Sequence, residues 1–152
     1  MNDISTNKLG FDNLVYTLTA LPIIAFMQLD GIANDGISWE DVEVATPIIG
    51  ADGKVAINNK PVVYTGTLNL MATSNSRKAI DNLILLSTPF YGKKAADYEL
   101  ILTEVNNTTK TRTVYAGGQF SNAQSGNNAN LDDGQGNKTY QWFFSSKIII
   151  PF

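Results

Sequence analysis

The side chains that most often carry out catalysis or bind metals are scarce in this sequence. It contains no cysteine and no histidine, which removes thiol nucleophiles, imidazole bases, disulfides and the usual zinc ligands. Among the acidic residues, Glu40, Asp41 and Glu43 are the obvious candidates for the acid and base of a glycoside hydrolase. Adjacent acidic residues on a strand more often form a solvated face, so we assign no catalytic residue.

Three further segments have the composition of a ligand site without its spacing. The oxygen-rich stretches 30–35 and 130–134 lack the EF-hand order of ligands with glycine at the sixth position. The glycines of 134–138 do not follow the Walker pattern and do not open a helix. Ser74 to Lys78 comes near a Ser-Lys nucleophile pair, but a helix cap followed by solvated charges explains it better. The sequence therefore predicts a protein that is not an enzyme, with no metal and no cofactor.

The segment 39–59 predicts two strands joined by an unusually apolar hairpin. Asp52-Gly53 is a strong signal for a tight turn, because both central positions tolerate positive φ. The strands on either side of the turn carry four aliphatic residues: Ile48, Ile49, Val55 and Ile57. Soluble proteins normally cover an apolar edge of this kind. Either the hairpin folds back onto its own core, or it contacts a partner.

Several short motifs follow one another between residues 30 and 76. They are a Gly/Asp turn at 30–36, the acidic strand Trp39-Glu-Asp-Val-Glu43, the hairpin Gly50-Ala-Asp-Gly53, the strand Gly66-Thr-Leu-Asn-Leu70 and Thr73-Ser74 before a helix. In order and spacing they resemble the tail tube proteins of contractile-tailed bacteriophages, a family related to the tubes of phage-derived injection systems. The similarity covers residues 21–86 and extends more loosely to 117–119 and to the aromatic strand 140–144.

This resemblance implies a structural virion protein whose hexameric rings stack into a tube, with the sheets of neighbouring subunits joined edge to edge into one large closed barrel. It also implies a tail sheath protein outside the tube, baseplate and terminator proteins at its ends, and transient, non-specific passage of DNA into the host. A second class of function stays open, a small β-sandwich carbohydrate- or receptor-binding module of a virion. Such modules display exposed aromatic side chains, whereas Trp39, Trp142, Phe143 and Phe144 lie in strand patterns that predict burial or subunit contact.

Composition sets limits that do not depend on the resemblance. The 152 residues suit a single domain, 1–152, which can bury about 70% of the surface of its unfolded chain. A net charge of −3 leaves little basic surface to hold nucleic acid, which agrees with a conduit that DNA crosses quickly. The polar start of the chain has no targeting segment, and the longest apolar runs are far shorter than the about 20 residues of a membrane span. We expect synthesis in the host cytoplasm and incorporation into the virion tail.

Alternation of β-branched and aromatic residues predicts a mainly β protein, an antiparallel β-sandwich or open barrel of about six to eight strands with one α-helix. The expected strands are 13–20, 22–28, 37–45, 61–73, 98–105, 109–116 and 139–150, with turns at 34–36 and 106–108. Ser74 is the expected N-cap of the helix, which should end near Ser87. A helical stripe predicts its core face: Ile80, Leu83, Ile84 and Leu86.

Two polar segments and two sets of contact residues complete the expectations. The N-terminal arm, 1–11, and the polar loop, 121–138, should be mobile in free subunits and ordered on assembly. The hairpin should contact the next ring through Ile48, Ile49, Asp52, Gly53, Val55 and Ile57. The polar faces opposite the apolar sets should line the lumen, and a register error of one residue would reverse this assignment. The lumen candidates are Asp41, Glu43, Thr65, Thr67, Asn69, Glu99 and Thr103.

Overall fold

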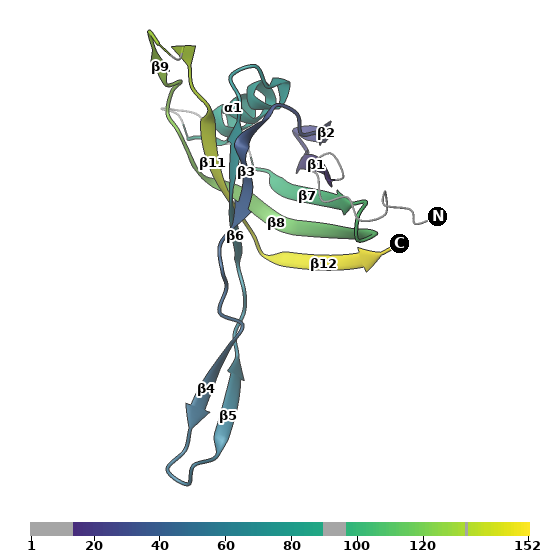
Figure 1. The fold of residues 1–152 in the computed structure, drawn as a ribbon, viewed down its shortest axis with the longest axis vertical. Helices are drawn as coiled ribbons and strands as arrows, with labels where there is room; N and C mark the ends of the chain where they lie inside the picture. Colours follow the sequence, from purple (N-terminus) through teal and green to yellow (C-terminus); the bar gives the residue numbers. More distant parts are fainter. Residues whose placement is uncertain (1–13, 90–96, 133) are drawn as a thin grey trace, which may run out of the picture.

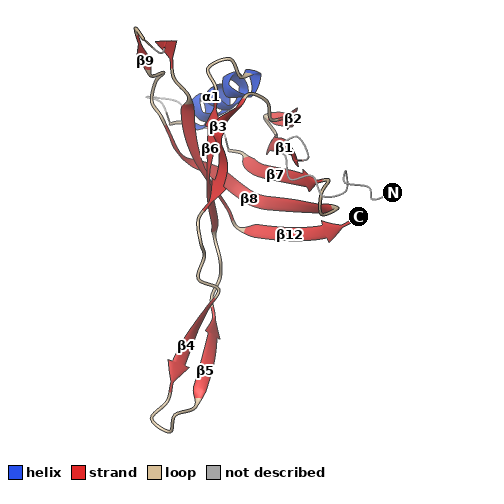
Figure 2. Ribbon diagram, in the orientation of Figure 1, coloured by secondary structure: helices blue, strands red, loops and turns tan. Residues whose placement is uncertain are grey.

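The structure is a computed structural model, and it describes residues 14–89, 97–132 and 134–152. Strands dominate the described part of the chain, together with one helix (Figures 1 and 2). The elements are β1 (Leu14–Leu21), β2 (Ile24–Gln28), β3 (Ile32–Trp39), β4 (Ala45–Ile49), β5 (Val55–Asn59), β6 (Tyr64–Leu70), α1 (Asn75–Ser87), β7 (Glu99–Asn106), β8 (Thr111–Ala123), β9 (Ala129–Asn130), β10 (Gly134–Gln135), β11 (Lys138–Phe144) and β12 (Ser146–Pro151). The N-terminal segment 1–11, which was expected to be mobile, lies outside the described residues.

The main sheet is antiparallel and has the strand order β2-β1-β7-β8-β11-β6-β3, with β12 also paired to β8. The long strand β8 serves both halves of this sheet. Its first part pairs with β7 and β12, and its last part pairs with β11. Between these parts Gly117 has a φ of +66°, and a Cβ on Gly118 would lie 2.4 Å from Cδ1 of Phe144. Glycine therefore permits β8 to bend here, and the sheet curls into an open half-barrel, as the predicted open-barrel fold requires.

The core lies inside the curl of the sheet. In β11 buried and half-buried residues alternate strictly, which confirms the period-two prediction for this strand. Side chains from both halves of the sheet and from α1 meet in one cluster, in which the fully buried members include Leu18, Leu68, Leu70, Ile80, Leu83, Leu100, Leu102, Tyr140, Trp142 and Phe144. Each strand of the curl thus has one face toward the core and one face away from it.

Helix α1 begins and ends where the sequence predicts. Ser74 is the N-cap, and its side chain accepts a hydrogen bond from the backbone N–H of Arg77 at 3.3 Å. Ile80 and Leu83 are buried and Ile84 is half-buried. Leu86 is 48% exposed, so its assignment to the core was wrong. It lies at the edge of a stripe that is only wide enough to bury the i, i+3 and i+4 positions.

Several expected strand boundaries were wrong. Residues 34–36 do not form a separate turn; they lie within β3, which has an irregular register between Ile32 and Ile37 and a positive φ at Gly36. The expected strand 37–45 ends at Trp39. The expected strand 139–150 is broken at Ser145, where the chain passes from β11 to β12. The loop 121–138 is shorter than expected, since β8 continues to Ala123 and β9 and β10 form a small hairpin.

Candidate assembly surfaces

Strands β4 and β5 form an arm that projects from the body of the molecule (Figure 1). The arm, which we define as residues 40–63, carries its strand pairs from Ala45 opposite Asn59 to Ile49 opposite Val55. Its aliphatic side chains are bare: Ile48 is 52% exposed, Ile49 75%, Val55 62% and Ile57 70%. The interpretation in which the hairpin folds back onto its own core is therefore wrong.

The tip of the arm is fixed by its own hydrogen bonds. The N–H of Gly53 donates to the carbonyl of Gly50 at 3.0 Å, and the N–H of Gly50 donates to the carbonyl of Lys54 at 2.9 Å. Asp52 Oδ1 accepts a further bond from the N–H of Lys54 at 3.1 Å. With a φ of +80° at Gly53 only, this is a three-residue turn with a bulge rather than the two-residue turn expected.

The base of the arm is anchored to the sheet. Trp39, the last residue of β3, stacks on Tyr115 with ring centroids 4.4 Å apart, and the N–H of Glu40 donates to the carbonyl of Thr65 at 2.9 Å. Further from the sheet along the arm, Lys60 Nζ lies 3.2 Å from Glu43 Oε1. The Thr46 hydroxyl donates to the same carboxylate at 2.7 Å, and this hydrogen bond lowers the pKa of Glu43. Asp41 and Glu43 thus lie on the arm and not on a sheet face.

The other expected lumen residues fall on two different surfaces. Thr65, Thr67 and Asn69 form a row on β6, opposite the buried Leu68 and Leu70. Glu99 and Thr103 lie on β7, in the other half of the sheet. Because the core lies between the two halves, the two rows point away from it on different sides. The structure therefore does not bring the seven residues to one surface.

Asn69 is more buried than a lumen-facing residue should be. Its side-chain amide donates to the carbonyl of Gly36 at 3.2 Å and accepts from the hydroxyl of Thr139 at 2.7 Å. With 8% of its surface exposed, Asn69 holds the irregular part of β3 against β6 and β11. Its polarity serves a hydrogen bond within the subunit.

The half of the sheet that contains β7 has a bare face and free edges. Strands β2 and β12 lie at its two ends, and in the described part of the chain each pairs with one strand only. The face opposite the core, which we call the bare face, carries Thr17, Thr19, Glu99, Ile101, Thr103, Arg112, Val114, Ile148 and Ile150. The edge strand β12 was not predicted as a separate element, although the run of three isoleucines from 148 to 150 signalled an exposed apolar strand.

A polar network connects α1 to the loop between β8 and β11. Asp81 Oδ1 lies 2.8 Å from Lys138 Nζ and accepts a hydrogen bond from the Tyr140 hydroxyl at 2.5 Å. Burial, together with this bond to a carboxylate, raises the pKa of Tyr140. The buried Arg77 donates to the Asn127 side chain and to the carbonyl of Gly136. The network explains how a polar loop is held to the body, and sequence reasoning missed it.

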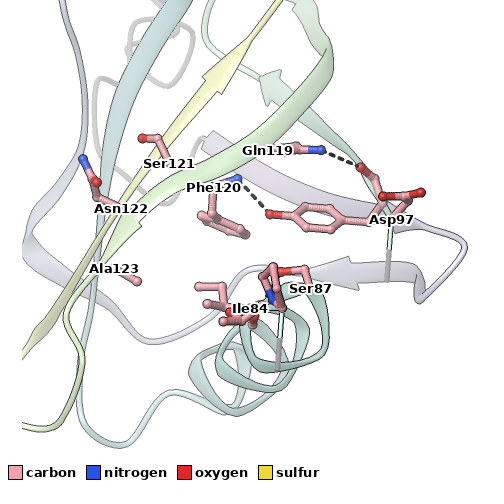
Figure 3. Close-up of a pocket in the computed structure, with 11 residues that line it drawn as sticks. Ile84, Ser87, Asp97, Gln119, Phe120, Ser121, Asn122 and Ala123 are labelled. Atoms are coloured by element: carbon pink, nitrogen blue, oxygen red, sulfur yellow. Dashed lines mark hydrogen bonds between the residues drawn. The ribbon is translucent and has the colours of Figure 1, made fainter. Parts of the chain in front are cut away.

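A pocket of about 320 Å³ lies where the end of α1 faces β8 (Figure 3). Ile84 and Ser87 face Phe120 and Ala123 across it, and the Tyr98 hydroxyl accepts a hydrogen bond from the N–H of Phe120 at 3.0 Å. Asp97 is the single charged residue among its described lining residues. Within residues 14–89, 97–132 and 134–152, no three His, Cys, Asp or Glu side chains gather closely enough to hold a metal ion.

The curled antiparallel sheet, single helix and projecting arm define a tail-tube-like fold. Three solved structures share it over nearly their whole length. A chain of the PVC sheath-tube complex of an extracellular contractile injection system, in the extended state, is 8% identical, with 100% of both chains covered and a TM-score of 0.61. The tube terminating cap of the anti-feeding prophage is 8% identical, with 95% of this chain and 92% of that chain covered and a TM-score of 0.59. The PVC sheath/tube terminator in the extended state is 6% identical, with 94% and 96% covered and a TM-score of 0.57.

These likenesses confirm the expected fold. Because the sequence identities are only 6% to 8%, they show the fold of this chain and nothing beyond it. No family model and no curated protein matches the sequence. Among the described residues, no helix has the length and apolar character needed to cross a membrane. What the chain does within its fold class follows from its surfaces.

Proposed function

We propose that this chain is a tail tube subunit that polymerises into stacked hexameric rings and forms the inner conduit through which DNA is delivered into a host. The observation that carries the proposal is the arm, whose aliphatic side chains its own subunit leaves bare. A monomer would gain nothing from such a projection, whereas a polymer buries it in every subunit. The likeness to a chain of a sheath-tube complex supports the same conclusion.

Ring closure uses the free edges of the sheet. In this proposal β12 of one subunit pairs with β2 of its neighbour, so that closing the ring leaves no edge exposed in the half of the sheet that contains β7. The core and α1 lie on one side of this half of the sheet. Because those bulky parts need the larger circumference, the bare face turns inward and lines the lumen. Of the candidate lumen residues, Glu99 and Thr103 then face the channel, and the row of Thr65, Thr67 and Asn69 faces elsewhere.

Stacking of the rings uses the arm. Each buried aliphatic side chain contributes roughly 1.5 to 3 kcal/mol, and the arm offers Ile48, Ile49, Val55 and Ile57. Asp52 and Gly53 hold the tip in the shape that presents them. Repetition around a ring makes this a large axial contact even if each copy buries its side chains only in part.

The bare face suits a conduit for a polyanion. Among the residues that the structure describes, its charged ones are Glu99 and Arg112, and they form no stripe of cations that would hold the phosphates of passing DNA. In the proposed particle a sheath protein surrounds the tube, and terminator and baseplate proteins close its ends. The protein then acts in the tail of a virion, in a structural role without catalysis.

The second candidate, a carbohydrate- or receptor-binding module, finds less support. Each Trp and Tyr side chain that the structure describes is at least half-buried. The exposed Phe26 and Phe152 lie on β2 and directly after β12, at opposite edges of this half of the sheet, so they do not form one aromatic platform. Negative-stain electron microscopy of the purified protein separates the two. Rings or hollow tubes are expected for a tube subunit, and a field of separate small particles at high concentration would favour the binding module.

A further inference from the structure

A groove lies at the end of the molecule opposite the arm. Figure 1 shows the arm at one end of the long axis, and α1, the start of β11 and the β9–β10 hairpin at the other. The groove, about 420 Å³ in volume, runs between the outer side of α1 and the chain that follows β8. Its lining residues are Asp81, Ile84, Leu85, Thr88, Ala123, Gln124, Ser125, Gly126, Asn127 and Lys138.

One wall of the groove is apolar and remains exposed in the single subunit. Leu85 lies on it with 73% of its surface exposed, next to the half-buried Ile84 and close to Ala123. On the floor, Lys138 and Asp81 neutralise one another at 2.8 Å. The remaining lining residues are polar or glycine: Thr88, Gln124, Ser125, Gly126 and Asn127. A visiting segment therefore needs aliphatic side chains next to hydrogen-bonding groups, and no net charge.

We infer that this groove is the receptor for the arm of a second copy of this chain. The distal part of the arm, 46–58, matches it in chemistry, since its four bare aliphatic residues meet the apolar wall and the charges of Asp52 and Lys54 cancel. The arm also extends well beyond its own subunit, because the ten residues 40–49 in extended form span about 33 Å (Figure 1). Leu85 packs against Ile49 in this contact, which makes it a residue that determines where the arm docks.

The positions of arm and groove set the symmetry of the contact. A projection at one end that fits a receptor at the other end is a heterologous contact, which repeats without limit along one direction. The inference rests on the proposed function in supplying the axial contact of the tube, and it adds the receiving surface. It also gives a role to the Arg77 and Lys138 bonds, which hold the far wall of the groove in place.

Disulfide trapping tests the inference directly, because the chain has no cysteine of its own. The probe is the double variant Ile49→Cys with Leu85→Cys, and the control is Ile49→Cys with Ile150→Cys, which moves the second thiol to β12. Both proteins are oxidised at high concentration, separated without reductant and imaged in negative stain. We expect a ladder of linked subunits for the first pair and at most trace dimers for the second.

The outcomes separate the groove from the proposed function. Tubes that also give the ladder of linked subunits support both the groove and the tube subunit. Tubes without the ladder contradict the groove as the docking site and remain consistent with a tube subunit. Linked subunits without tubes support the groove and count against the tube. The absence of both tubes and links would overturn both proposals.

As a second measurement, Leu85→Asp should raise the protein concentration needed for assembly about tenfold or more, and Leu86→Asp, one residue away on the same helix, should not. Equal effects of the two variants would overturn the assignment.

Discussion

Asp30 joins the β2–β3 connection to the start of α1. Its carboxylate accepts hydrogen bonds from the backbone N–H of Ser76 at 2.9 Å, from the Ser76 hydroxyl at 2.9 Å and from the Ser74 hydroxyl at 3.2 Å. These bonds, the backbone one first, lower the pKa of Asp30 below its ordinary value of 3.8. The charged carboxylate therefore stabilises the fold above the pKa of the unfolded chain, and the contribution is lost as the pH falls through the folded pKa.

We expect Asp30→Asn to lower the melting temperature near neutral pH and to have less effect in acid. The uncharged amide cannot reproduce a charge-assisted acceptor, but below the folded pKa the parent has lost its charge as well. Thermal melts of parent and variant from about pH 7 to about pH 2 measure this. Asp132→Asn, at an exposed position, serves as the control. A difference between parent and Asp30→Asn that stays constant over this range would contradict the account.

Gly66 lies where two aromatic side chains leave no room for a methyl group. A Cβ there would approach Nε1 of Trp142 to 2.6 Å, Cε3 of Trp39 to 2.8 Å and the carbonyl oxygen of Ser38 to 2.9 Å. We expect Gly66→Ala to lower the free energy of unfolding by about 1 to 3 kcal/mol, the usual cost of overpacking. Urea unfolding measures it, with Gly126→Ala as the control because nothing lies within 4 Å of that position. Equal stabilities would show that the base of the arm is loosely packed.

At the scale of elements, the parts that depend on local sequence could be predicted. Ser74 and the Ile80/Leu83 spacing fix the helix, because a cap and a stripe act within a few residues. The composition of the arm likewise predicted an apolar hairpin, but it left open whether the hairpin folds back onto its own core, and the structure shows the side chains exposed. The lumen residues could not be assigned, because the side to which Thr65 or Thr103 points depends on the bend of β8 at Gly117. The close neighbours at this bend are Ser145 beside Gly117 and Phe144 beside Gly118, and both are far away in the sequence.

The arm should be needed for assembly and not for folding. Ile49→Asp places a charge in a contact that is dry only between subunits, so we expect a melting temperature close to that of the parent and loss of tubes. Sedimentation of the assembled fraction measures this beside the melting curves. Asn58→Asp adds a charge to the same hairpin at a polar position and should keep assembly. Long tubes from Ile49→Asp would show that stacking uses another surface, and an unfolded variant would contradict the exposure of Ile49.

At the scale of the whole molecule, three exposed surfaces that the subunit does not cover point in three different directions. The arm lies at one end of the long axis, the groove beside α1 lies at the other, and the free edges β2 and β12 bound the bare face. Edges that pair with each other close a ring, and ends that fit each other stack the rings. In the proposed tube, a single chain thus carries the contacts for both directions. Assembly also covers the apolar surface that would otherwise make the subunit aggregate.

Cryo-electron microscopy of the assembled protein tests the tube most directly. We expect a hollow tube in which β12 of each subunit pairs with β2 of its neighbour, α1 lies outside the barrel, and Thr103 faces the lumen. An assembly in which α1 lines the channel, or in which β2 and β12 remain unpaired, would contradict it, as would a protein that stays monomeric at the highest concentration reached.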